Sequence, residues 1–446
     1  MANKPGSRIL HCGVLTKLLT LPSKRQIVLK LSSFGQKFSA RSGAVQLMED
    51  LGNALIENPN ALLMGGGNPG QIPAMQAIFE ERLHSLNSDS LLSHNLLGRY
   101  QSPKGEQSFT KELAGFLKRR FGWDLSERNI AISNGSQSAF FILFNLFAGN
   151  MQTGKHRSIH LPLSPEYLGY ADIGLCENFF SATAPTIEIL DDSEFKYRVN
   201  FNDLEIVDSM AALCVSRPTN PTGNVLTDHE IAHLDEIARG NTIPLIIDGA
   251  YGLPFPNIIF NEAKAHWNEN TILVLSLSKL GLPGVRTGII VASEEIVQAY
   301  NNANTVINLA CATLGPAMCQ PLFANNQIET LSHRHITPFY KQKSQQCAQW
   351  FKEHLVGLPF RIHKPEGAIF LWLWFEDLPV SSERLYQRLK KRGVIVVSGH
   401  NFFVGINQQW QHKDECIRVS YAADQHTVEQ GVKIIAQEVR RAYSEG

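Results

Sequence analysis

Reactive side chains directly follow predicted β-strands in the middle of this chain. Asp248 comes after one short apolar run, and Lys279 comes after the next, within Ser276-Leu277-Ser278-Lys279. Ligands of open α/β sheets bind at the carboxyl ends of the strands, so we expect these two side chains to lie close together. A lysine can hold an aldehyde as a Schiff base, and a buried aspartate can keep a ring nitrogen protonated. The pair therefore predicts covalent catalysis on an aldehyde-bearing cofactor.

Donors for a phosphate group occur at the same predicted edge. The run Asn134-Gly135-Ser136-Gln137 opens a predicted helix, where backbone N–H groups and the helix dipole favour an anion. The predicted phosphate shell comprises Gly135, Ser136, Gln137, Ser276, Ser278 and Arg286. Each feature alone has an ordinary structural explanation as a turn, cap or solvated residue. Together they match pyridoxal phosphate, with Lys279 and Asp248 as the catalytic residues.

The elements that must position these residues alternate regularly from about residue 110. Short β-rich runs at 130–133, 158–163, 211–216, 244–248, 272–276 and 288–292 are predicted strands. Helical stretches such as 137–148 and 227–239 lie between them, which favours an α/β domain with a largely parallel sheet. Beyond about residue 310 longer helical stretches dominate, with strands expected at 368–375, 394–398 and 417–421. We interpret this C-terminal pattern as a second, smaller α+β domain.

The predicted division of the chain has four parts. We expect a disordered leader or a start codon set too far upstream at residues 1–30, and an N-terminal segment packing with the small domain at 31–64. The large cofactor-binding domain is expected at 65–310 and the small domain at 311–446. The first 48 residues are basic and contain no Asp or Glu, so import into an organelle is the alternative interpretation of the leader.

Composition limits the classes of function. The 446 residues carry 41 basic and 41 acidic side chains, so no overall field attracts nucleic acid. The seven cysteines form no Cys-x-x-Cys pair, which indicates a reducing, cytoplasmic location. Apolar runs are far shorter than the roughly 18 residues that span a bilayer, so no membrane segment is expected. Small molecules are the expected partners.

The chain resembles the fold-type I pyridoxal-phosphate aminotransferases over about residues 34–443. Ser-x-Ser-Lys followed by Pro-Gly-x-Arg, downstream of Asn-Pro-Thr-Gly and Asp-x-x-Tyr, is a specific combination. The matching segments are 65–69, 100–105, 133–147, 216–225, 248–256, 276–284, 365–375 and 418–421. The resemblance implies an α/β fold: a large domain with a mostly parallel, mixed seven-stranded sheet and helices on both faces, plus the smaller α+β domain.

Further roles are implied by the resemblance alone. Tyr167 is similar to the aromatic residue that stacks on the cofactor ring, and Asn220 and Tyr251 are similar to donors to its phenolic oxygen. Arg418 is placed like the arginine that binds the substrate α-carboxylate, with Gly67 and Asn220 beside that group. Tyr100 matches a tyrosine that reaches the cofactor phosphate of the neighbouring subunit, which implies a homodimer with shared active sites.

The implied reaction is a ping-pong transfer of an amino group between valine and 2-oxoisovalerate on one side and alanine and pyruvate on the other. Lys279 serves as both anchor and general base. Other aliphatic amino acids remain open as substrates, and a lyase or decarboxylase would share every cofactor residue. A transcriptional regulator with an aminotransferase-like domain is the non-enzyme alternative, although only about 30 residues precede the matched region.

Two motifs and one departure from the family pattern need an explanation. The run His229-Glu230-Ile231-Ala232-His233 matches a zinc-peptidase motif. However, Thr227 and Glu230 form a predicted capping box, and both histidines fall opposite the predicted buried stripe of Ile231, Leu234 and Ala238. We therefore predict no metal site. The glycines at 65–70 lack dinucleotide-loop spacing. Arg217 stands before Asn220 where relatives often have a neutral residue.

Overall fold

The computed structural model describes residues 30–445 of the chain. The prediction of a leader at residues 1–30 therefore falls almost entirely outside the described residues. The described residues divide into two units, one ending at Ala40 and the other beginning at Arg41. The described part of the first unit contains helix α1 (Ser33–Phe38), whose N-cap Ser32 accepts a hydrogen bond from the Gly35 amide. All of the predicted site residues belong to the second unit.

A mixed sheet of eight strands forms the centre of the second unit. Its path is β2-β11-β10-β9-β8-β4-β3, and β5 pairs with β4. The strands are β2 (Ile130–Ser133), β3 (Gly149–Asn150), β4 (His156–Leu161), β5 (Phe180–Ala182), β8 (Met210–Ser216), β9 (Leu245–Asp248), β10 (Thr271–Ser276) and β11 (Gly288–Val291). Strands β5, β4, β8, β9 and β10 run parallel, whereas β11 pairs antiparallel with both β10 and β2. The expected seven strands become eight in the described residues because the two-residue β3 extends the edge.

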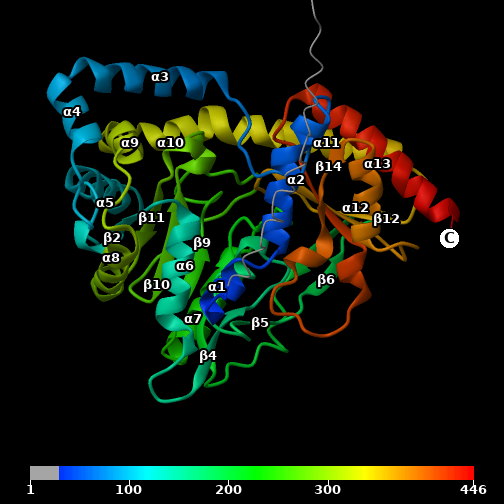
Figure 1. Ribbon diagram of the computed structural model, residues 1–446, viewed down its shortest axis with the longest axis horizontal. Helices are drawn as coiled ribbons and strands as arrows, with labels where there is room; N and C mark the ends of the chain where they lie inside the picture. The colour runs from blue at the N-terminus through cyan, green and yellow to red at the C-terminus, as the bar shows by residue number, and fades with distance from the viewer. Residues whose placement is uncertain (1–29, 446) are drawn as a thin grey trace, which may run out of the picture. The chain divides into compact units, whose positions relative to one another are not determined.

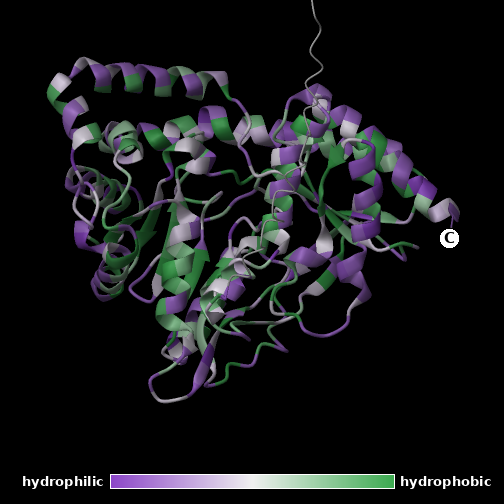
Figure 2. Ribbon diagram, in the orientation of Figure 1, coloured by the Kyte–Doolittle hydropathy of each residue, from purple (hydrophilic) through white to green (hydrophobic). Residues whose placement is uncertain are grey.

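Both faces of this sheet are buried, each against its own hydrophobic core. In β8, Leu213 and Val215 pack into one core, and Ala212 and Cys214 pack into the other. The same alternation occurs in β9, β10 and β11. Side chains of successive strand residues point to opposite faces, so helices must cover both sides. Figure 2 shows the strands as largely hydrophobic, with the hydrophilic residues on the outer faces of the helices.

Helices pack on both faces, as the family resemblance predicts. Helices α6 and α8 contribute to one core, and α5 and α7 contribute to the other; α6 crosses in front of the sheet in Figure 1. The helices of this unit are α2 (Gly43–Glu57), α3 (Pro73–Ser88), α4 (Ser90–Gly98), α5 (Gln107–Phe121), α6 (Ser136–Phe147), α7 (Asp228–Gly240), α8 (Glu294–Asn308), α9 (Leu314–Ala324), α10 (Gln327–Leu331), α11 (Thr337–His354), α12 (Ser382–Lys391) and α13 (Gln425–Glu445).

A second sheet carries the C-terminal part of the chain, with strand order β15-β16-β13-β12-β7-β6. Its strands are β6 (Thr186–Ile189), β7 (Glu194–Arg198), β12 (Phe360–His363), β13 (Phe370–Phe375), β15 (Val397–Ser398) and β16 (Cys416–Ser420). The short pair β1 (Leu62–Leu63) and β14 (Val394–Ile395) is parallel. Strands β6 and β7 come from the middle of the chain, so the predicted large domain contributes a hairpin to this sheet. The division at residue 310 stays a prediction.

Among residues 30–445, no helix has both the length and the apolar character that crossing a membrane requires.

Three histidines in the packed parts of the structure are buried and neutral. Burial lowers the pKa of His160 to about 4 and the pKa of His363 and His412 to about 3. His160 lies between the hydroxyls of Ser181 and Thr183, at 2.9 and 3.0 Å. The unfolded chain binds a proton at each histidine below about pH 6.5, whereas the folded chain does not. Each histidine therefore stabilises the fold above pH 6.5 and destabilises it progressively as the pH falls below that value.

We expect His160→Gln to weaken the acid sensitivity of the protein. Between pH 8 and pH 5 the wild type should lose about 2 kcal/mol of unfolding free energy through His160, and the variant should not. The measurement is urea unfolding of both proteins at the two pH values. His229→Gln, at an exposed position on α7, is the matched control and should behave like the wild type. Equal pH dependence in His160→Gln and wild type would contradict the assignment of a neutral, buried His160.

Candidate active site

The predicted phosphate donors lie where β2 ends and α6 begins. Gly135 is the N-cap residue of α6, has φ +91°, and supplies no side chain to cap the helix amides. A Cβ atom built on it would lie 2.3 Å from Nη2 of Arg286, so the guanidinium rests directly against the glycine backbone. Arg286 itself is exposed. A cation, a helix N-terminus and uncapped amides therefore converge, and this combination suits a phosphate group.

The remaining phosphate-shell candidates lie beside this cradle with contacts of their own. The Ser276 hydroxyl accepts a hydrogen bond from the Ser278 amide at 3.1 Å, which shapes the turn before Lys279. The Gln137 side chain donates to the Gly169 carbonyl at 2.9 Å and so ties α6 to the turn after Tyr167. Gln137 therefore lies at the predicted position, but its side chain stabilises the turn after Tyr167, which leaves its backbone amide as the candidate phosphate donor.

Asp248 ends β9, and Lys279 lies in the 3₁₀ turn that follows the adjacent parallel strand β10. The pairing of the two strands aligns Val274 with Asp248. Asp248 is 8% exposed and accepts hydrogen bonds from the Tyr170 hydroxyl at 2.7 Å and the Ala250 amide at 2.9 Å. Burial raises the pKa of Asp248, and the bond from Tyr170 partly offsets that rise. Both carboxylate oxygens are therefore fixed in place at the end of the strand.

The Lys279 amine points to the N-terminal segment of the unit. Its Nζ atom donates to the Gly67 carbonyl and lies 5.2 Å from the centre of the Tyr251 ring. Burial, helped by the nearby positive charges of Arg418 and Arg286, lowers the pKa of Lys279 to about 8. A substantial fraction of the amine is therefore neutral near physiological pH, as a nucleophile or general base requires.

Arg418 lies in β16 and is 2% exposed. It donates from Nη1 to Oδ1 of Asn220 at 2.7 Å and from Nη2 to the Gly65 carbonyl at 2.5 Å. Its guanidinium carbon is 4.1 Å from the centre of the Phe370 ring and 4.9 Å from that of Phe402. Burial lowers the pKa of Arg418 to about 10, so the group stays charged. Within residues 30–445, the Nε atom has no hydrogen-bond partner.

The aromatic candidates complete the same site. Tyr251 is 6% exposed and meets Phe370 edge to face at 5.9 Å. The Tyr167 ring meets Tyr170 edge to face at 5.4 Å, and both the Arg418 and Asp248 charges act on its hydroxyl. The structure therefore brings together Asp248, Lys279, Arg418, Asn220, Gly67, Tyr167 and Tyr251. Tyr100 is 86% exposed and is not brought to the site of its own chain.

Two residues at this site were not predicted from the sequence. Tyr170 donates a hydrogen bond to Asp248. The sequence signal that could have identified Tyr170 was its position three residues after Tyr167, and the structure places it in one turn of 3₁₀ helix. Glu166 accepts hydrogen bonds from the Ser216 amide at 2.8 Å and from the Ser216 hydroxyl. Burial raises the pKa of Glu166 to about 8, despite the opposing effect of the bonds from Ser216. The available sequence signal was a charged residue between Pro165 and Tyr167, in the loop that follows β4.

The zinc-peptidase motif lies on α7 and has other partners. Glu230 completes the predicted capping box, because its carboxylate accepts from the Thr227 amide at 2.7 Å. His233 stacks on Phe201 with 4.4 Å between ring centres, so it is half-buried rather than solvated as expected, whereas His229 is exposed. In the described part of the chain, no group of three or more His, Cys, Asp or Glu side chains is arranged to hold a metal ion. The capping function accounts for the glutamate of this motif.

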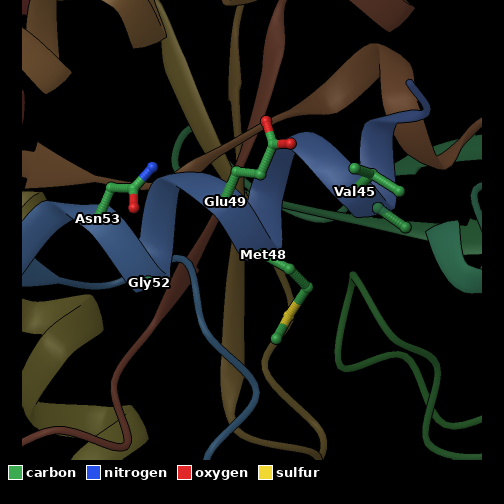
Figure 3. A pocket seen from close by; sticks show the side chains of 6 residues that line it. Val45, Met48, Glu49, Gly52 and Asn53 are labelled. Carbon is green, nitrogen blue, oxygen red and sulfur yellow. The ribbon is translucent and has the colours of Figure 1, made fainter. Parts of the chain in front are cut away.

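The described residues form a surface depression along α2 and a cavity beside Lys279. One is an open depression along α2, bordered by Val45, Met48, Glu49 and Asn53, and Figure 3 shows their side chains on a single helix. It includes none of the predicted site residues. The other is a cavity of about 150 Å³ beside Lys279. Its lining is both polar and apolar and comes from the segment 68–79, the turn 279–283 and Tyr340.

A doubly covered α/β sheet with a lysine, an aspartate and a phosphate cradle at its strand ends is the arrangement of a pyridoxal-phosphate-dependent enzyme of fold type I. The comparisons with known proteins agree. The sequence profile of aminotransferase class I and II matches residues 60–435, and the chain belongs to this family. The resemblance stated from the sequence is thereby confirmed.

Individual relatives are similar over almost their full lengths. The valine–pyruvate aminotransferase of Escherichia coli (strain K12) is 49% identical over 414 residues, which are 93% of this chain and 99% of that protein. The crystal structure of valine-pyruvate aminotransferase AvtA from Salmonella typhimurium LT2 is 48% identical with a TM-score of 0.83, covering 90% of this chain and 100% of that one. A structure from Psychrobacter arcticum 273-4, assigned as an amino-acid aminotransferase, is 46% identical with a TM-score of 0.91, covering 94% and 100%.

Proposed function

We propose that this transaminase exchanges amino groups between valine and 2-oxoisovalerate on one side and alanine and pyruvate on the other. The observation that carries the proposal is the 49% identity to the Escherichia coli valine–pyruvate aminotransferase across 93% of this chain. The cavity beside Lys279 includes the apolar side chains of Ile72, Met75 and Phe79 in its lining, and these are compatible with an aliphatic substrate side chain. The cytoplasmic location stays a prediction.

The residues present fit pyridoxal phosphate. In our assignment the phosphate binds to the amides of Gly135, Ser136 and Gln137, with Arg286 and the serines 276 and 278 around it, because that cradle joins a cation to uncapped helix amides. Asp248 would hold the pyridine nitrogen, and Tyr170 and the Ala250 amide fix the orientation of its carboxylate. Asn220 and Tyr251 would donate to the phenolic oxygen, and Tyr167 would cover the ring. When bound, the cofactor supplies an electron sink for the bond broken at the substrate Cα.

Lys279 then moves the proton. Its amine has a pKa lowered to about 8, so near neutral pH it could accept a proton from the substrate Cα and deliver it to the C4′ carbon of the cofactor. In the second half-reaction it would move a proton from C4′ to the Cα of the product amino acid. Its contacts with the Gly67 carbonyl and the Tyr251 ring place the amine between the N-terminal segment and the sheet edge.

Arg418 binds the α-carboxylate that every substrate shares. An arginine has five N–H donors, and two of those of Arg418 go to Asn220 and Gly65. The unpartnered Nε–H and the remaining N–H groups are available for a bidentate bond to a carboxylate. Because the pocket is buried, this bond excludes water and fixes the Cα relative to Lys279.

A screen of amino donors with pyruvate as acceptor tests the substrate pair. We expect valine to react with a kcat/KM at least about tenfold above those of aspartate and phenylalanine, a difference that one well-filled apolar site supplies. Alanine with 2-oxoisovalerate should run the reverse reaction. Omitting the oxo acid should limit the enzyme to one turnover per site. Continuous turnover of valine without an oxo acid would indicate a lyase or decarboxylase, and a preference for another donor would reject valine as the substrate.

We propose that the enzyme is a homodimer. Leu97, in the last turn of α4, and Tyr100, just after that helix, are each 86% exposed, and Val306 is 88% exposed near the end of α8. The Thr313 hydroxyl donates to the Leu96 carbonyl at 3.1 Å, so these apolar residues belong to neighbouring segments. Large apolar side chains exposed on neighbouring segments favour a protein partner, and the family resemblance gives Tyr100 a role in the partner's active site.

Light scattering tests the dimer. We expect twice the chain mass of 49.7 kDa for the wild type. Leu97→Asp and Val306→Asp should yield monomers, because a buried, unpaired charge at an interface is costly. Val356→Asp changes another exposed apolar residue, 69% exposed outside this surface, and should remain a dimer. A monomeric wild type would refute the proposal.

A further inference from the structure

Arg217 is a buried arginine at the base of the loop that carries Asn220. Its side chain is 6% exposed although it carries a full charge. The guanidinium donates from Nε to the Leu226 carbonyl at 2.7 Å, from Nη1 to the Lys264 carbonyl at 2.9 Å and from Nη2 to Oδ1 of Asp228 at 2.7 Å. A charge this deeply buried is retained only where such bonds replace its hydration.

These three bonds join three separate pieces of chain. Leu226 is at the far end of the loop, so the bond from Arg217 closes the loop across its base. Asp228 lies in the first turn of α7, and Lys264 lies in the connection between β9 and β10. The Asp228 carboxylate also accepts from the Lys264 amide at 2.9 Å. Burial opposes its ionisation, but the bond from Arg217 keeps the pKa of Asp228 below its usual value.

The backbone of the loop is equally constrained. Inside it, the Thr219 amide donates to the Asn224 carbonyl and the Gly223 amide donates to the Thr219 carbonyl, both at 2.8 Å. A Cβ atom on Gly252 would lie 2.1 Å from the Arg217 carbonyl oxygen, so the neighbouring chain packs directly on Arg217. The loop therefore holds Asn220 at one position, with Oδ1 of its side chain 2.7 Å from Arg418.

All three side-chain hydrogen bonds of Arg217 go to the frame of the loop, and none goes to a side chain assigned to the cofactor or the substrate. The Arg217 backbone amide donates to the Asp248 carbonyl at 2.9 Å, which joins the start of the loop to the end of β9. Hydrogen bonds weaken steeply with misalignment, so a small displacement of the loop would weaken both contacts proposed for Asn220. We propose that Arg217 is a positioning residue that fixes Asn220 for its contacts with the cofactor phenolic oxygen and with Arg418. The inference rests on the role of Asn220 in the proposed function.

The test uses the loaded enzyme and the variant Arg217→Met, which keeps the stem and removes every donor. The readouts are KM and kcat for valine and alanine, and the pH midpoint of the visible absorbance change of the bound cofactor. We expect KM to rise at least about fivefold for both substrates. Because a donor to the phenolic oxygen favours its ionised form, the midpoint should rise by about half a pH unit. Arg217→Lys should give intermediate values, since lysine keeps the charge and loses the planar fork.

A double-mutant cycle with Asn220→Ala decides whether Arg217 acts through Asn220. We expect Asn220→Ala to shift the midpoint by about one unit, and Arg217→Met to add nothing in that background. Additive shifts would mean that Arg217 acts by another route and would overturn the proposal. No shift in Asn220→Ala would instead refute the assignment of Asn220, and the inference with it.

A matched control separates positioning from loss of stability. Arg361 also donates to a carboxylate and to a carbonyl, those of Glu376 and Asp191, on the second sheet. Arg361→Met should lower the thermal stability as Arg217→Met does, yet leave KM and the absorbance midpoint unchanged. If Arg217→Met lowers only the stability, Arg217 is not a positioning residue. Should that variant not fold, Arg217→Lys and Asp228→Asn carry the same test, because each removes only part of the network.

Discussion

Replacing Lys279 with alanine should remove transamination and the visible absorbance of the bound cofactor together. Lys279 is the anchor and the general base in the proposed cycle, and its amine is already poised with a pKa of about 8 beside the Gly67 carbonyl. Loss of a positioned base costs up to about 10⁴-fold, and loss of the covalent anchor adds to that. We expect kcat to fall by about 10⁴-fold or more for valine and for alanine. Borohydride should fix the cofactor to the wild type and not to the variant.

The control for Lys279→Ala is Lys391→Ala, at an exposed position at the end of α12. It removes a lysine of the same kind outside the site and should retain both activity and borohydride fixation. Thermal unfolding of the two variants without cofactor shows whether either loses its fold. A folded Lys279→Ala enzyme with wild-type turnover would show that Lys279 is not the catalytic lysine.

The catalytic pair could be predicted from sequence because it depends on local patterns. Asp248 and Lys279 each end an apolar run, and adjacent parallel strands necessarily bring such ends together. The capping box of α7 was predictable for the same reason, since Thr227 and Glu230 are three residues apart. In both cases the geometry follows from backbone periodicity alone.

Contacts between side chains from distant segments could not be predicted in this way. Tyr170 reaches Asp248, and Glu166 reaches Ser216, only once the turn after β4 packs against the ends of β8 and β9. The position of β6 and β7 in the C-terminal sheet is likewise determined by tertiary packing. A strand with alternating polar and apolar residues could pair with either sheet, so its local sequence does not identify the sheet it joins. Arg217 illustrates the difference best. In the sequence it is only an unusual loop residue, and its three partners become visible only in the folded chain.

Arg418 required the family resemblance, because nothing in its local pattern distinguishes a substrate ligand from a buried ion-pair residue. The structure explains why an arginine, rather than a lysine, occupies position 418. The guanidinium lies against the rings of Phe370 and Phe402, and its two bonds to Asn220 and Gly65 leave Nε–H unpaired. A planar group satisfies the stacking and the bonds at once, and an ammonium group cannot.

Arg418→Lys should therefore lower kcat/KM for every amino acid alike. The variant keeps the positive charge and loses the bidentate bond to the α-carboxylate in a buried site, which should cost about 2 to 4 kcal/mol of transition-state stabilisation. That corresponds to roughly 30-fold to 1000-fold. Pyridoxal phosphate affinity should barely change, because Arg418 is not part of the phosphate cradle at Gly135 and Arg286.

The measurement compares the valine and alanine half-reactions of Arg418→Lys with its binding of pyridoxal phosphate. Valine and alanine present the same α-carboxylate to Arg418 and differ only beyond Cα. If Arg418 binds that carboxylate, the substitution must therefore lower kcat/KM for both substrates to the same extent. A loss confined to valine would place Arg418 at the side chain instead. If both half-reactions stay within about threefold of the wild type, the carboxylate must be bound elsewhere, and the bonds from Arg418 to Asn220 and Gly65 would be purely structural.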